Sequence, residues 1–148
     1  MLEANATLAR IKSDNQLANI VKEADLIICC ADEPPLEIKR LVTRSAEIAV
    51  LFGAVSVRHG TVGPLLKKTW EIQQYLQWSN KIHQTCEKVL VPAGFPLNGV
   101  TNAIIANLVA MEAMRYLGDL GSSRVSSYLI DLDFNNFSFT KIKNFNPD

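Results

Sequence analysis

The sequence lacks three features that would quickly assign it to a class of protein. No apolar run approaches the roughly 20 residues of a membrane-spanning helix, so we expect no membrane span. Charge of one sign is missing too, because 15 basic and 15 acidic residues cancel and leave no electrostatic footprint for nucleic acid. Residues 1–5 show neither the charged nor the apolar region of a secretory signal. We therefore expect a cytoplasmic protein that binds neither nucleic acid nor a membrane.

Cysteine is scarce, and its placement argues against two further kinds of site. Three cysteines, two of them adjacent, do not make a disulfide framework. A structural zinc site built from two Cys-x-x-Cys pairs needs four cysteines, more than the sequence holds. Cys29 and Cys30 fall on a predicted strand, where successive side chains point to opposite faces and do not chelate together. We expect no zinc site within this sequence.

Glycine is few in number and lacks one informative spacing. A nucleotide-binding loop of the Gly-x-Gly-x-x-Gly type cradles phosphates with its backbone, and no glycines here have that spacing. The seven glycines are Gly53, Gly60, Gly63, Gly94, Gly99, Gly118 and Gly121. A phosphate-binding loop of this type would therefore have to lie upstream of Met1.

The composition that remains is that of an ordinary globular protein. The apolar fraction is 48% and the charged fraction is 20%, and 148 residues suffice for one domain with a substantial core. No repeat, linker or low-complexity tract divides the chain. We expect a single domain over residues 1–148.

The most informative stretch is an apolar run that ends in two acids and two prolines. Residues 26–31 have the length and apolarity of a strand that is buried on both faces. Pro34 and Pro35 stop the strand and suit the first turn of a helix. Asp32 therefore lies at the carboxyl end of a predicted parallel strand, the edge where open α/β sheets bind ligands.

Two interpretations of Asp32 stay open on this pattern. A carboxylate at such an edge is placed to hold a metal ion beside a phosphate. Aspartate is also a good helix N-cap, and either Asp32 or Glu33 could cap the helix that begins near Pro34. The local pattern alone favours the cap.

The order of predicted elements indicates an α/β sheet of mixed direction. Strands at 7–11, 26–31 and 48–55 alternate with helices after Ser13 and at 35–46, a pattern typical of parallel strands with right-handed crossovers. A strand-like segment then leads to a predicted turn at Gly63-Pro64. Helices are predicted over 67–90 and 102–117, and Gly118 fits a left-handed helix stop. The segments 123–131 and 137–143, joined around 133–136, predict an antiparallel hairpin.

Other polar residues attract ordinary interpretations. Lys67, Lys68 and Glu71 are expected on a solvated helical face. His59 could face a substrate cleft, but a solvated or hydrogen-bonded histidine is the simpler interpretation. His83 has no ligand-spaced partner, and the spacing of Cys86 is that of a packing residue, although nearby His83 and Lys88 could lower its pKa.

The sequence of motifs resembles the C-terminal half of the ThiF/MoeB/HesA family of ubiquitin-activating-enzyme-like adenylyltransferases. The resemblance rests on the strand that ends in Asp32, the segment Gly60–Pro64, the helix with Glu112 and Arg115 before Leu117-Gly118, and the final hairpin with Asp131. It implies a Rossmann-like mixed sheet with βαβ crossovers and a C-terminal antiparallel hairpin. The N-terminal nucleotide-binding half of the family fold is not in this sequence.

The resemblance also implies an activity and a set of site residues. Family members activate the C-terminal carboxylate of a ubiquitin-like carrier protein or peptide as an acyl-adenylate, using ATP and Mg²⁺. By this resemblance Asp32 is the catalytic residue and metal ligand, and Glu33 assists it at the cofactor or acts as a cap. A substrate groove is expected at Gly60, Thr61, Gly63 and Pro64 and along residues 92–98. Without a phosphate-binding loop, the chain alone is expected to be inactive.

Two other functions stay open. A domain of this fold without the phosphate loop could bind a peptide or a partner subunit without catalysis, by adding a strand to a sheet edge. It could also be half of another Rossmann protein such as a dehydrogenase, although the missing glycine loop counts equally against that. Because a partial sheet exposes apolar surface, we expect a homodimer.

Overall fold

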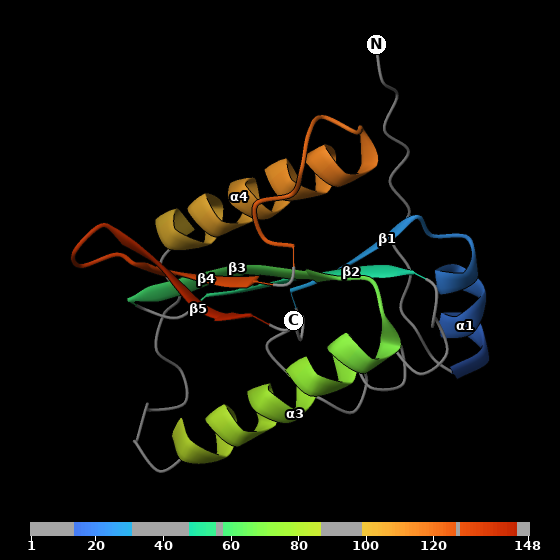
Figure 1. Cartoon of the computed structure of the whole chain (residues 1–148), viewed down its shortest axis with the longest axis horizontal. Coiled ribbons are helices and arrows are strands. Elements are labelled where there is room, and N and C mark those ends of the chain that lie inside the picture. The colour runs from blue at the N-terminus through green and yellow to red at the C-terminus, as the bar shows by residue number, and fades with distance from the viewer. Residues whose placement is uncertain (1–13, 31–47, 56–57, 87–98, 127, 145–148) are drawn as a thin grey trace.

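The computed structural model describes residues 14–30, 48–55, 58–86, 99–126 and 128–144. A five-stranded sheet lies between two long helices, with α4 (Gly99–Leu117) on one face and α3 (Thr69–Cys86) on the other (Figure 1). The short helix α1 (Asp14–Lys22) lies at the end of the sheet where β1 begins. No helix among these residues is long and apolar enough to cross a membrane.

The sheet is mixed, as the sequence predicts. Its strands are β1 (Leu26–Cys29), β2 (Ala49–Val55), β3 (His59–Leu66), β4 (Tyr128–Asp133) and β5 (Ser138–Asn144), in the spatial order β1-β2-β3-β4-β5. β1 and β2 are parallel, and the other three neighbouring pairs are antiparallel. The predicted strand at 7–11 and the predicted helix at 35–46 lie outside the described residues.

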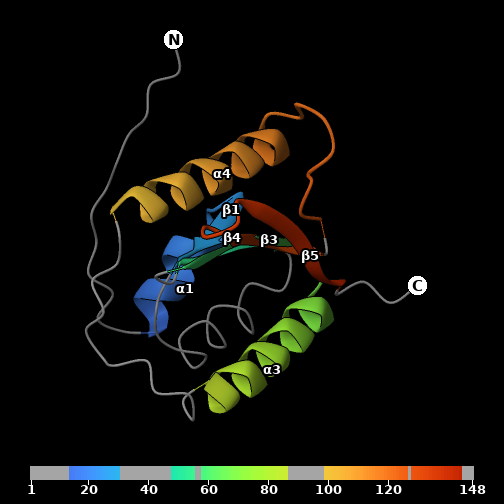
Figure 2. The same ribbon diagram turned by 90° about the vertical axis from the view of Figure 1, so that its left-hand side faces the viewer.

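The sheet lies between α4 and α3 (Figure 2). An apolar cluster packs on each face of the sheet and holds the layers together. β2 contributes to both, because Leu51 turns toward α4 while Val50 and Phe52 turn toward α3. The two adjacent cysteines follow the same alternation. Cys29 packs with the α3-side cluster, and the Cys30 sulfur lies 3.4 Å from where a Cβ on Gly53 would stand, on the α4 side. The prediction that they face opposite sides is confirmed.

The predicted turn at Gly63-Pro64 is wrong. β3 continues through both residues to Leu66, and the peptide bond between them is cis. The strand accommodates them at an irregularity, since the β2 register shifts between Leu51 and Gly53 and the pairing with β4 ends at Val62. A proline without an N–H fits where the ladder is interrupted. Gly63 has a φ of 86°, which favours glycine.

Helix α3 lies within the predicted range, but its first turn corrects one expectation. Glu71 is only 5% exposed and does not lie on a solvated face. Its carboxylate accepts hydrogen bonds from the backbone N–H groups of Lys67 and Lys68, both at 3.1 Å. This is the reciprocal half of a capping box, in which an acidic residue in the first turn reaches back to the start of the helix.

Helix α4 begins three residues before the predicted start and ends at the predicted Leu117. The left-handed residue at its end is Asp119, with a φ of 49°, and not Gly118. The N–H of Leu120 reaches the carbonyl of Arg115 at 3.2 Å, as in a Schellman motif that is shifted by one residue from the prediction. Aspartate tolerates this conformation better than most residues, so the glycine is not needed there.

The C-terminal hairpin is confirmed, with a later start. β4 begins at Tyr128, and residues 123–126 form a separate segment in which Ser126 bridges to Leu65. Asp133 closes the turn to β5, since its carboxylate accepts hydrogen bonds from the N–H of Asn135 at 2.8 Å and the side chain of Asn136 at 2.6 Å. These bonds, the backbone bond from Asn135 first, lower the pKa of Asp133 below its usual value.

Candidate functional site

A cavity lies where the two parallel strands end beneath the start of α4. β1 and β2 run in the same direction, so their carboxyl ends meet at one edge of the sheet. The cavity has a volume of about 270 Å³, and its lining combines strand ends with the first two turns of α4. The lining residues are Cys30, Gly53, Ala54, Val55, Asn102, Ile105 and Ala106. This is the edge at which open α/β sheets bind ligands.

Two glycines let α4 approach the sheet closely enough to roof this cavity. A Cβ on Gly53 would lie 2.7 Å from a methyl group of Val109, and a Cβ on Gly60 would lie 2.4 Å from the side chain of Ile105. Both distances are shorter than side-chain carbons tolerate. The absence of a side chain at Gly53 and Gly60 therefore sets the height of α4 above β2 and β3.

No charged side chain lies among the described residues that line the cavity. Its walls are apolar except for Asn102, Cys30 and backbone groups. No acidic residue lies in the first turn of α4, so nothing there offsets the partial positive charge of the helix N-terminus. Desolvation, and secondly the neighbouring Cys29, raise the pKa of the Cys30 thiol. Cys30 is therefore protonated at neutral pH and is a poor nucleophile.

The residues predicted to be catalytic are close in sequence to Cys30, which lines this cavity. Asp32 and Glu33 follow Cys30 by two and three residues, but they lie outside the described residues, as does the segment 92–98. His83 and Cys86 belong to α3, and their side chains are not among those described. The roles given to Asp32 and Glu33 stay predictions.

The four residues predicted to border a substrate groove all lie in β3. Gly60, Gly63 and Pro64 are buried, and Thr61 is half-buried between Ala54 of β2 and Asp131 of β4. A Cβ on Gly63 would lie 2.6 Å from the carbonyl oxygen of Tyr128, so this glycine also serves a close contact. None of the four lines the cavity at the strand ends. Their role in binding substrate stays a prediction.

The described part of the cavity does not supply a magnesium site. Mg²⁺ prefers several oxygen ligands in octahedral geometry, commonly including carboxylates. The lining offers one side-chain amide, from Asn102, and a thiol. Across the described residues, no three His, Cys, Asp or Glu side chains gather closely enough to hold a metal ion. The Mg²⁺ assignment therefore depends on Asp32.

A histidine–aspartate pair lies at the same edge of the sheet, on strands β3 and β4. His59 Nδ1 is 3.0 Å from a carboxylate oxygen of Asp131. The histidine side chain is half exposed and the aspartate is 20% exposed. This agrees with the hydrogen-bonded interpretation of His59. The hydrogen bond orients the imidazole ring of His59, and it places a polar side chain at the start of β3.

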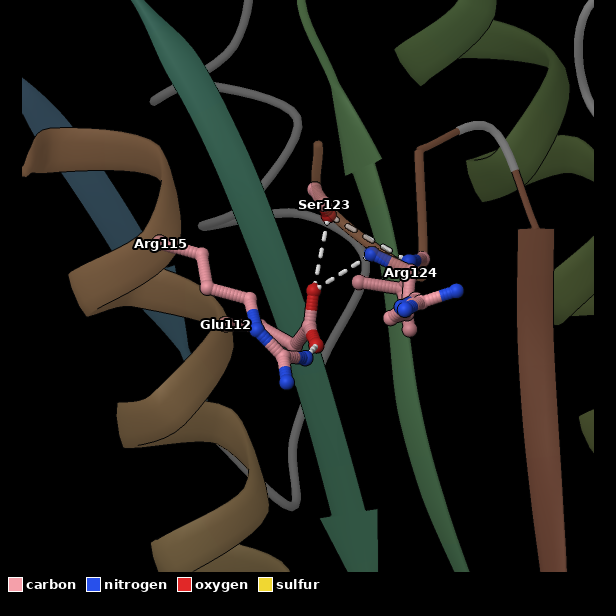
Figure 3. A network of polar contacts seen from close by, with 5 residues as sticks. Glu112, Arg115, Ser123 and Arg124 are labelled. Atoms are coloured by element: carbon pink, nitrogen blue, oxygen red, sulfur yellow. Dashed lines mark hydrogen bonds and ion pairs between the residues drawn. The ribbon is translucent and has the colours of Figure 1, made fainter. Parts of the chain in front are cut away.

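The opposite end of α4 carries a buried polar network that sequence reasoning missed (Figure 3). Glu112 is 3% exposed and pairs with Arg115 through one carboxylate oxygen. Its other oxygen accepts hydrogen bonds from the Ser123 hydroxyl at 2.9 Å and the Arg124 N–H at 2.8 Å. Glu112 thus ties the segment after α4 to the helix. The signal in the sequence is its spacing, because Ile105, Val109 and Glu112 share the buried face.

A family model shows to which protein family the chain belongs. The ThiF family model matches residues 1–148, the whole chain. The chain belongs to the ThiF family. This confirms the resemblance stated from the order of motifs. The comparison with curated proteins finds no match.

Solved structures with the same fold include PaaA and the MccB protein of E. coli. MccB with ATP has a TM-score of 0.64 and 18% identity, covering 93% of this chain and 41% of MccB. MccB with AMPCPP and MccA has a TM-score of 0.63 and 19% identity, with coverage of 93% and 41%. PaaA has a TM-score of 0.64 and 11% identity, with coverage of 92% and 47%. At these identities the likeness establishes the fold alone, and the chain spans less than half the length of these proteins.

Proposed function

We propose that this chain is the C-terminal portion of an ATP-dependent adenylyltransferase domain. The observation that supports it best is the ThiF family match over residues 1–148, joined to a cavity at the carboxyl edge of the parallel strands. In this proposal residues 1–148 form one domain, and the phosphates of ATP are bound chiefly by a loop outside this chain. Asp32 holds Mg²⁺ at the strand end, and Glu33 assists it or caps the following helix.

The proposed substrate is the C-terminal carboxylate of a peptide or a ubiquitin-like carrier. Structures of MccB contain the MccA peptide and, separately, ATP, and these ligands belong to that protein. They favour a peptide over a folded carrier for this chain. Gly60, Thr61, Gly63 and Pro64 would shape the groove through the backbone of β3 without touching the carboxylate, which would enter the cavity roofed by α4. Attack on the α-phosphate then yields an acyl-adenylate and releases pyrophosphate.

In this scheme the residues of this chain position the substrate and ATP and form no covalent bond with either. The α4 N-terminus, free of acidic side chains in its first turn, favours an anionic group in the cavity. The apolar walls from Ala54, Ile105 and Ala106 limit water around the reacting groups. We further propose that the protein acts in the cytoplasm as a homodimer, and that this chain alone does not adenylate.

Peptide-dependent exchange of pyrophosphate into ATP tests the proposal in the natural protein that contains these residues. Ala106→Phe fills the cavity from the helix side, and we expect exchange to fall at least tenfold. Ala110→Phe is the matched control, because it is an exposed alanine one turn further along α4 that does not line the cavity. Equal exchange in both variants would remove the cavity from the mechanism.

A non-catalytic binding module is the second candidate. Among the described strands, β5 pairs only with β4, so its other edge is open to an added strand. In that case a peptide binds without any exchange activity. Peptide binding that is unchanged by Ala106→Phe and unaccompanied by exchange would favour this candidate.

A further inference from the structure

Another cavity lies at the opposite end of α4 from the candidate site. It has a volume of about 410 Å³, within the range of roughly 300–1,000 Å³ that is usual for small-molecule sites. Three parts of the chain line it, namely the end of β3 with Lys67, the last turn of α4, and the segment after that helix. Along the helix axis, Arg115 in its wall is about 15 Å from Ile105 in the first cavity. We call it the distal cavity.

Hydrogen bonds fix the β3 side of the distal cavity. The N–H of Leu65 donates to the carbonyl of Val125 at 2.9 Å, and Leu65 also forms a bridge with Ser126. The N–H of Lys67 donates to the Glu71 carboxylate at 3.1 Å. The contacts of Leu65 join the end of β3 to the segment after α4, and the bond to Glu71 holds the backbone from which the Lys67 side chain projects.

Glu112 fixes the α4 side of the distal cavity (Figure 3). This residue is 3% exposed, pairs with Arg115 and accepts a hydrogen bond from the Ser123 hydroxyl at 2.9 Å. Arg115 and Ser123 both line the cavity. The pair with Glu112 uses one guanidinium nitrogen of Arg115, and arginine has further N–H donors for a ligand. The wall of the distal cavity therefore has a fixed shape before any ligand binds.

Two opposite charges line the distal cavity without pairing with each other. Lys67 Nζ lies over the Tyr116 ring, 4.9 Å from its centre, and Asp119 follows the end of α4. Among the described residues, neither Lys67 nor Asp119 forms an ion pair. A ligand of one sign is attracted by one of these charges and repelled by the other. A ligand that carries both signs complements both.

We propose that the distal cavity binds a small amino acid through its carboxylate and its ammonium group together. The carboxylate lies beside Lys67 and the guanidinium of Arg115. The ammonium group lies beside Asp119, where the partial negative charge at the C-terminus of α4 also favours a cation. The hydroxyls of Ser122 and Ser126 can hydrogen-bond to either group. This site is separate from the cavity proposed for adenylation, so it adds a second ligand to the protein.

NMR titration of the isotope-labelled chain tests the site without any variant. The backbone amide signals of Tyr116, Gly121 and Ser122 report on the cavity wall. Glycine, β-alanine and γ-aminobutyrate carry the same two charges at increasing separation. We expect saturable shifts with at least one of these amino acids. Acetate and methylammonium, which carry one charge each, should bind about fivefold more weakly, because each loses one partly exposed ion pair.

Two charge-removing variants test the two halves of the site. Lys67→Gln and Asp119→Asn should each weaken binding of the best amino acid by about fivefold. Asparagine tolerates the left-handed conformation of Asp119, whose φ is 49°, so the fold is kept. Lys22→Gln and Asp25→Asn are the matched controls, because they remove the same charges from exposed residues that do not line the cavity. Circular dichroism checks that each variant is folded.

Three results would overturn the proposal. The first is the absence of saturable shifts with all three amino acids. The second is a plain anion site, shown by acetate that binds as tightly as the amino acids or by tighter binding in Asp119→Asn. The third is equal weakening in the two control variants, which would indicate a general effect of charge. No nucleotide or peptide substrate is present, so failure here leaves the proposed adenylation untouched.

Discussion

The two ends of helix α4 are held in place by different kinds of interaction. At its N-terminal end the helix rests on bare glycine backbone above an apolar cavity, and no side chain there forms an ion pair among the described residues. At its C-terminal end a buried carboxylate gathers an arginine, a serine hydroxyl and a backbone N–H into one network. The C-terminal end is fixed by a network centred on a buried carboxylate, whereas the N-terminal part of the helix packs closely on two glycines.

This difference separates a stabilising region from a functional one. A fully bonded polar network specifies a single arrangement, and removing one member leaves the others unsatisfied. A cavity roofed by a helix on glycine leaves room for a ligand and adds little stability of its own. Substitutions at the two ends should therefore separate activity from stability.

The largest expected effect is on activity and concerns Asp32, which follows the strand that leads to the cavity. If Asp32 holds the metal, Asp32→Asn lowers ATP–pyrophosphate exchange by orders of magnitude with little change in thermal stability. Asparagine caps a helix almost as well as aspartate. If Asp32 is only a cap, exchange survives and stability changes by less than about 1 kcal/mol. Exchange measured with the natural protein decides between the two roles.

The next effect is on stability, at the C-terminal end of α4. Glu112→Ala removes the acceptor for Ser123 and Arg124 and leaves the Arg115 side chain, 28% exposed, without its partner. We expect a loss of about 2–4 kcal/mol in the free energy of unfolding, measured by denaturant titration. Glu112→Gln keeps two of the contacts and should lose less. A loss below about 1 kcal/mol in Glu112→Ala would mean that the network contributes little to the stability of the fold.

A smaller stability effect tests the glycine contact beneath the N-terminal end. Gly60→Ala places a methyl group against Ile105 and should destabilise the fold by about 1–3 kcal/mol through overpacking. Gly99→Ala is the matched control, since nothing lies within 4 Å of a Cβ at Gly99. Equal unfolding midpoints for the two variants would contradict the close approach of α4 to β3.

The sequence predicted the main strands and helices better than it predicted the turn at Gly63-Pro64 and the buried carboxylates. Continuous apolarity predicted β1 and β2, and the apolar helix before Gly118 predicted α4, because periodicity and length are strong local signals. The Gly63-Pro64 turn was wrong, because a ladder irregularity set by β2 cannot be seen in the β3 sequence. Glu71 and Glu112 were not identified as buried groups, because a carboxylate's partners come from other segments once the chain is folded.

The sequence predicted where in the sheet the site lies, but it did not predict which residues line the site. Asp32 was placed at a ligand-binding edge from the strand that precedes it, and the cavity was found at that edge. The lining from α4 was not predicted, since Asn102 and Ala106 come from a helix about seventy residues further along the chain. Only the tertiary packing of α4 over Gly53 and Gly60 brings them there.

The smallest expected effect is chemical and concerns the thiol in the cavity wall. Burial and the neighbouring Cys29 raise the pKa of Cys30, so its neutral form predominates at pH 7. Iodoacetamide reacts with the thiolate, so alkylation of Cys30 should be slower than that of a model peptide thiol at the same pH. The rate should keep rising with pH beyond the ordinary thiol pKa before it levels off. Because the folded state binds this proton more tightly than the unfolded state, the associated stability is complete at low pH and declines at alkaline pH.

Tandem mass spectrometry separates alkylation of Cys30 from that of the adjacent Cys29 by fragment ions, and Cys30→Ser shows the contribution of Cys29 alone. Fast alkylation of Cys30 at pH 7 would instead reveal a stabilised thiolate. Cys30 would then offer a nucleophile to the cavity beneath the N-terminal end of α4, and a covalent step would have to be considered beside adenylate formation. Slow alkylation leaves this end of the helix as a purely positioning surface, in contrast to the bonded network at the other end.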